Sequence, residues 1–404
     1  MTSFLQFALL LVIILVAAKF AGYVSTLVGQ PSVLGELLVG LILGPSLIDV
    51  LHLPFFEDHL LGEMIDHLAE IGVLLLMFVA GLELHLSELA QNSKVSAFAG
   101  ISGVLFPIGL GYAVGFGFGF EPEQAFFLGL TLGATSVSIS AQTLIELRAL
   151  RSRVGLGLLG AAVFDDIMVI LLLSGFLALQ QGEGGFLAIL FIFVRMLIFL
   201  GLSVLFGIWV LPGLVRRISR LPISQGVVAL AIVVMLVYGI AAELVGGMAA
   251  ITGAFLAGLM FARSPEKDRL EHGISALSYG FFVPIFFVNI GLAVNVRQLE
   301  SSVVWLFVAI TIAAILGKWI GAGLGARLAG FSWREASQLG AGMISRGEVG
   351  LILASVGMSE ALVNEAEFSA IVGMVLITTL VTPPLLRVLF AERGSAASTQ
   401  LEPE

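Results

Sequence analysis

Apolar stretches long enough to cross a lipid bilayer follow one another along almost the whole chain, with short polar segments between them. Each crossing needs about 20 predominantly apolar residues. The weakest separations, at Gln30-Pro31 and Val245-Gly246-Gly247, leave twelve or fourteen helices as alternative counts. The pattern predicts an all-α polytopic membrane protein with thirteen transmembrane helices, at residues 3–29, 32–49, 63–86, 95–118, 123–146, 154–180, 186–214, 223–243, 245–262, 272–294, 302–327, 334–357 and 363–390.

Composition supports a membrane protein and excludes an ordinary soluble domain. Of the 404 residues, 59% are hydrophobic and 12% are charged, and the mean hydropathy is +1.09. Soluble domains carry about a quarter charged residues. The chain has no cysteine, which excludes disulfides and thiolate metal sites. It also lacks a phosphate-binding glycine loop and a nucleophile–base arrangement, so we expect no enzyme activity, no cofactor and no nucleic-acid partner, with membrane lipid as the surroundings.

Lysine and arginine are unevenly divided between the two sides of the predicted helices. With the N-terminus outside, the inner loops and tail carry fourteen basic residues, whereas the outer loops carry Arg297 alone. Because positively charged loops stay in the cytoplasm, we expect an external N-terminus and a cytoplasmic C-terminus in the cell (inner) membrane. Six helices, a connecting helix and six more then form an inverted repeat. The polar residues 391–404 after the last helix are expected to be a disordered cytoplasmic tail.

Two adjacent carboxylates, Asp165 and Asp166, lie in the middle of the sixth predicted helix, within GLGLLGAAVFDDIMVILLLSGFLAL. An aspartate at the bilayer centre costs about 2.5–3.5 kcal/mol on insertion scales, so a pair needs water, a cation or a basic partner. Neighbouring helical residues point about 100° apart. We therefore interpret the pair as functional and expect its two carboxylates to have different partners.

Lys318 is the natural basic partner for one of these carboxylates. It lies near the middle of the eleventh predicted helix, nine residues before Arg327 at the inner end, which is a rise of about 13 Å. The alternative is that Lys318 snorkels to the inner surface. That distance is long for a lysine side chain, so we favour a buried ion pair.

Two helices carry polar segments at matching positions, each as the fifth of six helices in its half of the repeat. The first contains LGATSVSIS, with Thr135, Ser136 and Ser138, and the second contains AGMISRGEVG, with Arg346 and Glu348. Small and hydroxyl residues also permit close helix packing, which is the alternative explanation. The matched positions and the intramembrane Arg346 and Glu348 favour two broken helices, whose freed backbone groups these side chains satisfy.

A carboxylate in a partly dry cavity can hold a proton or a monovalent cation, but not both. Whichever ion occupies the site neutralises it, whereas an empty, charged site is costly to move past an apolar barrier. The residues therefore predict coupled exchange of a cation for protons.

Five segments together resemble a known family: FDDIMVI, ATSVSIS, the GKWIGA around Lys318, ISRGEVGLI, and PIFFVNIGL at 284–292. They look like the monovalent cation:proton antiporters of the second cation–proton antiporter superfamily, which have an NhaA/NapA-type fold and include Kef-like membrane domains. The resemblance covers essentially the whole chain. It implies an elevator-type homodimer with a dimerisation domain at 1–90 and 221–297, a linker helix at 186–215, and an ion-transport core domain at 91–182 and 300–390 that contains two crossed broken helices.

The same resemblance implies roles for individual residues. Asp166 would bind the cation and the proton in turn, and Asp165 would pair with Lys318, with no metal beyond the transported cation. The broken helices would cross at Thr135, Ser136, Ser138, Arg346 and Glu348.

Kef-like systems tend to carry Gln-Asp at the pair and a cytosolic nucleotide-binding domain, whereas this chain has Asp-Asp and ends after the membrane part. We therefore expect electrogenic sodium/proton exchange that serves pH homeostasis, with lithium or potassium as other candidate ions. The alternatives are a Kef-type potassium/proton antiporter and a sodium-coupled organic anion symporter on the same fold. A potassium channel is disfavoured because the chain has no TVGYG-like filter segment.

Overall fold

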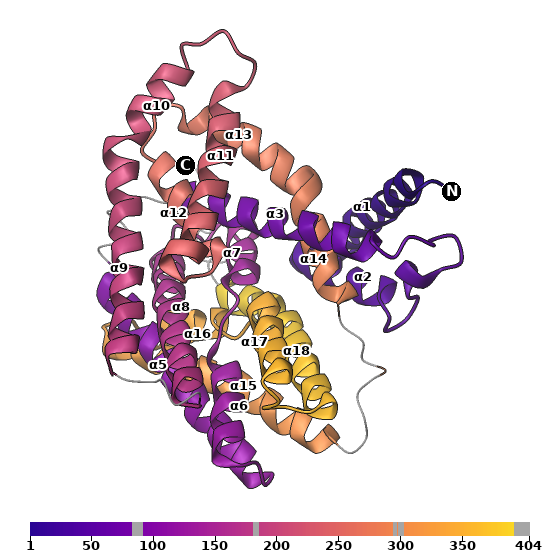
Figure 1. Ribbon diagram of the computed structural model, residues 1–404, viewed down its shortest axis with the longest axis vertical. Coiled ribbons are helices and arrows are strands. Elements are labelled where there is room, and N and C mark those ends of the chain that lie inside the picture. The colour runs from indigo at the N-terminus through magenta and orange to yellow at the C-terminus, as the bar shows by residue number, and fades with distance from the viewer. Residues whose placement is uncertain (83–91, 181–185, 294–296, 298–302, 392–404) are drawn as a thin grey trace, which may run out of the picture.

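The chain is helical (Figure 1). Its structure, a computed structural model, describes residues 1–82, 92–180, 186–293, 297 and 303–391. No strand occurs among these residues. The tail that the sequence predicts to be disordered lies, apart from residue 391, outside the described residues. The helices are α1 (Ser3–Leu27), α2 (Ser32–Leu43), α3 (Leu61–Leu82), α5 (Ser93–Gly117), α6 (Pro122–Gly133), α7 (Val137–Glu146), α8 (Arg153–Gln180), α9 (Phe186–Trp209), α10 (Leu211–Ile218), α11 (Gly226–Ala241), α12 (Ala250–Phe261), α13 (Lys267–Leu277), α14 (Val283–Leu292), α15 (Val304–Leu328), α16 (Trp333–Gly342), α17 (Gly347–Ser359) and α18 (Glu365–Phe390).

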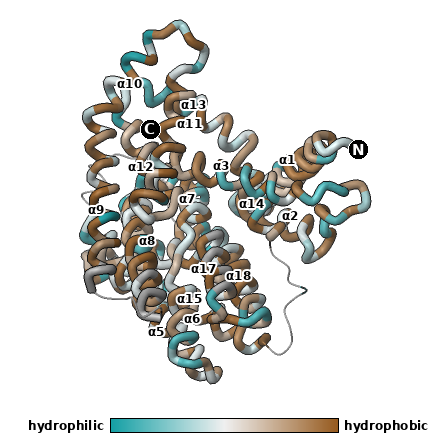
Figure 2. Tube along the Cα trace, viewed as in Figure 1, coloured by the Kyte–Doolittle hydropathy of each residue, from teal (hydrophilic) through white to brown (hydrophobic). Residues whose placement is uncertain are grey.

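The all-α polytopic fold class is confirmed. In the described part of the chain, ten helical segments are long and apolar enough to cross a membrane. Three shorter apolar helices, Ser32–Leu43, Ala250–Phe261 and Val349–Met358, lie at the other predicted positions. Helical segments therefore occur at all thirteen positions, while the count of thirteen membrane crossings stays a prediction. Figure 2 shows apolar residues along most of the helices and polar residues gathered mainly at their connections.

Three predicted helices are shorter or more divided than expected, for identifiable reasons. The helix expected at 32–49 ends at Leu43, because Gly44 and Pro45 follow it. The helix expected at 245–262 begins only at Ala250, after Gly247 with φ of 65°. The segment expected at 186–214 divides into α9 and α10, and Pro212 occupies the first turn of α10. The hydropathy pattern does not predict such backbone interruptions, because the residues that cause them do not make the segment polar.

The helices pack in two groups, each drawn from both halves of the chain (Figure 1). The α1 group contains α1, α2, α3, α11, α12, α13 and α14. The α5 group contains α5, α6, α7, α8, α15, α16, α17 and α18. The two groups meet where α7 packs against α2 and α3 and where α18 packs against α2. Helix α9 contacts both α8 and α12, so it joins the two groups along one side of the molecule (Figure 1).

Glycines let the helices of the α1 group approach at backbone distance. A Cβ atom on Gly258 of α12 would lie 2.0 Å from the Phe78 carbonyl oxygen of α3. Likewise, a Cβ atom on Gly40 of α2 would lie 2.2 Å from the Val288 carbonyl oxygen of α14. Small residues are what allow membrane helices to pack this closely. The α1 group is therefore held by contacts that leave little room for its helices to slide.

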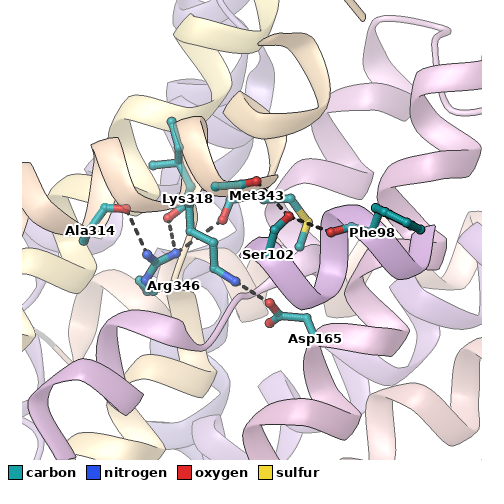
Figure 3. A network of polar contacts seen from close by, with 9 residues as sticks. Phe98, Ser102, Asp165, Ala314, Lys318, Met343 and Arg346 are labelled. Carbon is teal, nitrogen blue, oxygen red and sulfur yellow. Dashed lines mark hydrogen bonds and ion pairs between the residues drawn. The ribbon is translucent and has the colours of Figure 1, made fainter. Parts of the chain in front are cut away.

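Helix α15, which carries Lys318, is seated against α5 in the same manner. A Cβ atom on Gly325 would lie 2.3 Å from the Phe98 carbonyl oxygen. The Ser102 hydroxyl of α5 is 2.6 Å from the Phe98 carbonyl oxygen and 2.8 Å from the Gly321 carbonyl oxygen of α15, so it can donate to either (Figure 3). These contacts fix the height and rotation of α15.

Arg195 of α9 binds the irregular end of α11, where the helix widens to a π-helical turn at Ala242–Gly246. Its Nε donates to the Val245 carbonyl at 2.5 Å, and its Nη2 donates to the Leu244 carbonyl at 3.0 Å and the Glu243 carbonyl at 3.2 Å. The last carbonyls of a helix have no intrahelical donor. Arg195 therefore supplies donors that the end of α11 lacks.

Candidate functional site

Two interrupted helices form the centre of the α5 group. Helices α6 and α7 are separated by residues 134–136, and α16 and α17 by residues 343–346. The breaks lie in the two segments that the sequence singled out, and they adjoin in space. The Ser136 N–H donates to the Ser345 carbonyl at 2.9 Å, and the Ser140 hydroxyl donates to the Gly342 carbonyl at 2.5 Å.

Gly347 makes the close approach of the two breaks possible. Its φ of +42° lies in the left-handed region, which favours glycine. A Cβ atom at this position would lie 2.5 Å from the Ser136 hydroxyl oxygen. The hydroxyls of Ser136 and Ser138 lie 2.9 Å apart, and both side chains are buried. The predicted residues Ser136 and Ser138 therefore lie where the two breaks adjoin.

Arg346 is fully buried at the second break and binds backbone carbonyls. Its Nη1 donates to the carbonyls of Ile344 at 2.8 Å and Met343 at 3.3 Å, and its Nη2 donates to the Ala314 carbonyl of α15 at 3.0 Å (Figure 3). The C-terminal end of a helix carries a partial negative charge of roughly half a unit. Arg346 therefore compensates the interrupted end of α16 and ties it to α15.

Glu348, the other charged residue predicted at this break, lies in the first turn of α17. Its side chain is outside the part of the structure that can be described, so its role at the break stays a prediction.

Asp165 and Lys318 form a buried ion pair between α8 and α15. Their side chains are 1% and 0% exposed, and Lys318 Nζ donates to Asp165 Oδ1 (Figure 3). Thr135 of the first break is buried beside this carboxylate. Within the described residues, Asp165 Oδ2 and Thr135 Oγ1 are buried oxygens without a hydrogen bond of acceptable geometry. Removing either charge of such a pair leaves the other charge buried without a partner, which lowers the stability of the protein.

Asp166 faces a different environment from its neighbour. It is half-buried, and its Oδ2 accepts a hydrogen bond of 2.9 Å from the Thr252 hydroxyl of α12. It lines a narrow cavity between the two helix groups, whose other walls include Met77, Val137, Ile251 and Phe255. The structure thus separates the two carboxylates, one facing the interior of the α5 group and one facing the boundary between the groups.

Thr252 was not among the residues that the sequence singled out. The sequence contains a signal, a hydroxyl residue in the first turn of a short apolar helix, but its partner is 86 positions away. The Ala314 carbonyl and the Thr379 hydroxyl, which accepts from the Gly347 N–H at 3.2 Å, are further contacts of the second break that no local pattern reveals. Among the described residues, no group of three His, Cys, Asp or Glu side chains is arranged to hold a metal ion.

Fold and site define a multi-pass membrane protein of the transporter class, and comparisons with known proteins identify its family. Residues 11–392 match the family described as "Sodium/hydrogen exchanger, transmembrane". The chain belongs to this family.

Individual relatives cover nearly the whole chain. It is 38% identical to the Na⁺/H⁺–K⁺ antiporter GerN of Bacillus cereus, over 97% of this chain and 98% of GerN. It is 34% identical to the Na⁺/H⁺ antiporter of Enterococcus hirae, over 95% of this chain and 98% of that protein. The structure of the sodium proton antiporter MjNhaP1 from Methanocaldococcus jannaschii at pH 8 has the same fold, with a TM-score of 0.67, 16% identity and 99% of both chains covered.

The family expected from the sequence is thus confirmed. The matched family and the matched structure are of the sodium/hydrogen exchanger type and do not name an NhaA, NapA or Kef system. The narrower placement in the second cation–proton antiporter superfamily stays a prediction.

The ion pair predicts a non-additive effect on stability. Lys318→Met leaves the Asp165 carboxylate buried without its cation, which costs about 3–5 kcal/mol. We expect a clear fall in the midpoint temperature of unfolding, and recovery of most of that loss in the Lys318→Met, Asp165→Asn double variant. Tryptophan fluorescence during heating in detergent measures both effects.

A matched control is Arg153→Gln, which removes the Arg153–Glu335 pair with an exposed arginine and a nitrogen–oxygen distance of 3.6 Å. Exposed ion pairs contribute roughly 0–1 kcal/mol, so this variant should melt close to the parent. Equal melting of the single and double Lys318 variants would contradict the buried pair.

Proposed function

We propose that this protein is a secondary transporter that exchanges a monovalent cation, in the first place sodium, for protons by elevator-type alternating access. The observation that carries the proposal is Asp166, a carboxylate that faces the cavity between the two helix groups. Membership of the sodium/hydrogen exchanger family and the names of the antiporters from Bacillus cereus and Enterococcus hirae support it.

The exchange follows from the competition of two ions for one carboxylate. Asp166 holds either a proton or the cation, and each neutralises its charge. The cavity walls at Met77, Ile251 and Phe255 are apolar, so moving the carboxylate past them without an ion is costly. The empty carrier therefore stays in place, and inward movement of one ion requires outward movement of the other.

Buried residues of the α5 group have supporting roles in this mechanism. Lys318 neutralises Asp165, so the charge of the site changes with the loading of Asp166. The hydroxyls of Thr135, Ser136 and Ser138 lie at the first break and offer oxygen ligands of the kind that hard monovalent cations prefer. Arg346, with Glu348, stabilises the second break. Release of a second proton from the Asp165–Lys318 pair on cation entry makes the exchange electrogenic, with two protons for each cation.

Potassium is the second candidate ion, because the name of the Bacillus cereus relative GerN includes potassium as well as sodium. Symport of an organic anion fits less well. The cavity at Asp166 has room for roughly one water molecule, and a carboxylate facing it repels an anion.

We further propose that the two helix groups are functional domains. Residues 1–90 and 221–297, which contain the α1 group, form the scaffold of a homodimer; residues 91–182 and 300–390, which contain the α5 group, form the moving core; and 186–215 is the linker. The backbone contact between Gly258 and Phe78 supports a rigid scaffold. In lipid nanodiscs we expect a protein mass twice that of one chain. A single-chain mass at all protein concentrations would contradict the dimer.

The orientation that we propose, with an external N-terminus and a cytoplasmic C-terminus in the inner membrane, rests on the fourteen-to-one division of basic residues. The natural chain has no cysteine, so single cysteines report their position cleanly. In whole cells a membrane-impermeant maleimide should label Ser3→Cys and spare Ser219→Cys, with labelling of both after lysis as control. The reverse pattern would contradict the orientation.

Transport itself is tested in proteoliposomes that contain a pH dye. Pulses of sodium, lithium or potassium should dissipate an imposed pH gradient, and a clamped membrane potential should change the rate because two protons move for each cation. Asp166→Asn removes the exchangeable carboxylate, so the cation-driven signal should fall to the level of empty liposomes. The protein should still fold, because Asp166 lines a cavity and its asparagine replacement is isosteric.

Glu63→Gln, which removes an exposed carboxylate at the start of α3, serves as the matched control and should retain exchange. Persistent exchange in Asp166→Asn would overturn the assignment of this residue. A parent protein that responds to no cation would overturn the proposed function, and a response indifferent to potential would leave one-for-one exchange.

A further inference from the structure

Thr252 contacts the candidate ion-binding carboxylate from the opposite helix group. Its side chain is 4% exposed, and its hydroxyl donates to Asp166 Oδ2 at 2.9 Å. Thr252 lies on α12 of the α1 group, whereas Asp166 lies on α8 of the α5 group. The hydrogen bond therefore crosses the boundary between the two groups, at the cavity where we place the transported ion.

The hydroxyl of Thr252 is oriented differently from those of five other buried threonines within helices. Those of Thr131, Thr143, Thr311, Thr378 and Thr382 donate to the carbonyl four residues earlier in their own helix. Thr252 is the third residue of α12, so the carbonyl four residues earlier, that of Met248, lies before the helix. Its hydroxyl is thus available for an acceptor on another helix.

The backbone around Thr252 holds this donor in position. The Thr252 N–H donates to the Ala249 carbonyl at 3.0 Å, which closes the first turn of α12. At the next residue, a Cβ atom on Gly253 would lie 2.2 Å from the Tyr238 carbonyl oxygen of α11. Helix α12 is therefore in backbone contact with α11 beside Thr252, and the hydroxyl is presented by a part of the α1 group that has little freedom to move.

A hydroxyl donates more strongly to a charged carboxylate than to a neutral group. The bond from Thr252 to Asp166 is therefore strongest when Asp166 is empty and ionised, and weaker when a proton or a cation occupies the carboxylate. Asp165 is the neighbouring residue on the same helix, and Lys318 on α15 interacts electrostatically with Asp166. The residues that α3, α7 and α12 contribute to the cavity wall are uncharged.

We propose that Thr252 is a positioning residue that couples ion binding to movement, by holding the empty carrier across the boundary between the helix groups. With Asp166 charged, the hydrogen bond ties the α5 group to the α1 group. A bound proton or cation weakens this bond and releases the α5 group. Thr252 thereby opposes movement of the empty carrier, which is the step that would let one ion cross without the other. This role rests on the exchange function proposed above.

The test compares Thr252→Val, which keeps the shape of the side chain and removes the hydroxyl, with Thr252→Ser, which keeps the hydroxyl. In proteoliposomes we expect Thr252→Val to shift the pH dependence of the exchange rate by about one pH unit to the alkaline side. The reason is that the variant lacks the hydroxyl donor that favours the ionised form of Asp166. We also expect a several-fold rise in cation efflux without counter-moving protons. Thr252→Ser should match the parent in both measurements.

A second hydrogen bond between the helix groups, remote from Asp166, provides the control. It tests whether loss of any bond between the groups has the same effect as loss of the Thr252 hydroxyl. Ser32 of α2 donates from its hydroxyl to Glu146 Oε1 of α7 at 2.5 Å, and this bond also joins the two helix groups. Ser32→Ala should leave the pH profile in place. If Thr252→Val melts well below the parent, Thr252→Ala provides the same comparison with a smaller side chain.

Several outcomes would overturn the inference. One is a Thr252→Val protein with the pH profile and coupling of the parent, and another is a Thr252→Ser protein that behaves like the valine variant. A shift of the pH profile in Ser32→Ala equal to that in Thr252→Val would also count against it. These results differ from failure of the proposed function, in which the parent itself shows no exchange.

Discussion

The cost of burying charge in a membrane protein governs this structure. Lys318 and Arg346 are fully buried, and each is compensated in a different way: Lys318 by the Asp165 carboxylate, and Arg346 by backbone carbonyls at the end of α16 and on α15. Most carbonyls of an uninterrupted helix are already bonded within it, and the Ala314 carbonyl of α15 alone would give Arg346 a single acceptor, whereas the break after α16 adds the carbonyls of Met343 and Ile344. The interruption of α16 is therefore what makes a buried Arg346 tolerable, and Arg346 in turn satisfies the interruption. The second broken helix and the buried Arg346 depend on each other.

The division of the molecule into two helix groups places the site at a boundary between them. Close backbone contacts such as Gly258 with Phe78 make the α1 group a unit that resists internal sliding, and Gly325 with Phe98 does the same in the α5 group. At the boundary, cavity-lining side chains and hydrogen bonds from Thr252 to Asp166 and from Ser32 to Glu146 contribute to the contact. Relative movement of the groups breaks fewer interactions than movement within either group. The boundary at which we propose movement thus coincides with the surface that Asp166 faces.

Much of this arrangement was predictable from local sequence. The fold class followed from the apolar stretches. The breaks followed from polar residues at matched positions, because a polar group in the bilayer is costly unless a partner compensates it. The expected partner of Asp165 was predictable since Lys318 is too deep to snorkel. The ends of α2 and α12 were not predictable from hydropathy, because Gly44-Pro45 and Gly247 interrupt the backbone without lowering the apolar content. The carbonyl partners of Arg346 and the hydroxyl of Thr252 were missed because they depend on which helices become neighbours, and a single sequence does not encode that in any local pattern.

The continuity of α8 explains why the adjacent Asp165 and Asp166 have different partners. The helices that cross beside it are interrupted, but α8 runs unbroken from Arg153 to Gln180. On a continuous helix, consecutive side chains diverge by about 100°. One carboxylate is therefore directed into the α5 group, where it pairs with Lys318, and the next is directed to the cavity, where it accepts a hydrogen bond from the neutral Thr252 hydroxyl. A break within α8 would remove this fixed divergence and let both carboxylates compete for Lys318. The carboxylate at which we propose ion exchange is thus directed to the cavity by the geometry of an ordinary helix that packs against two interrupted ones.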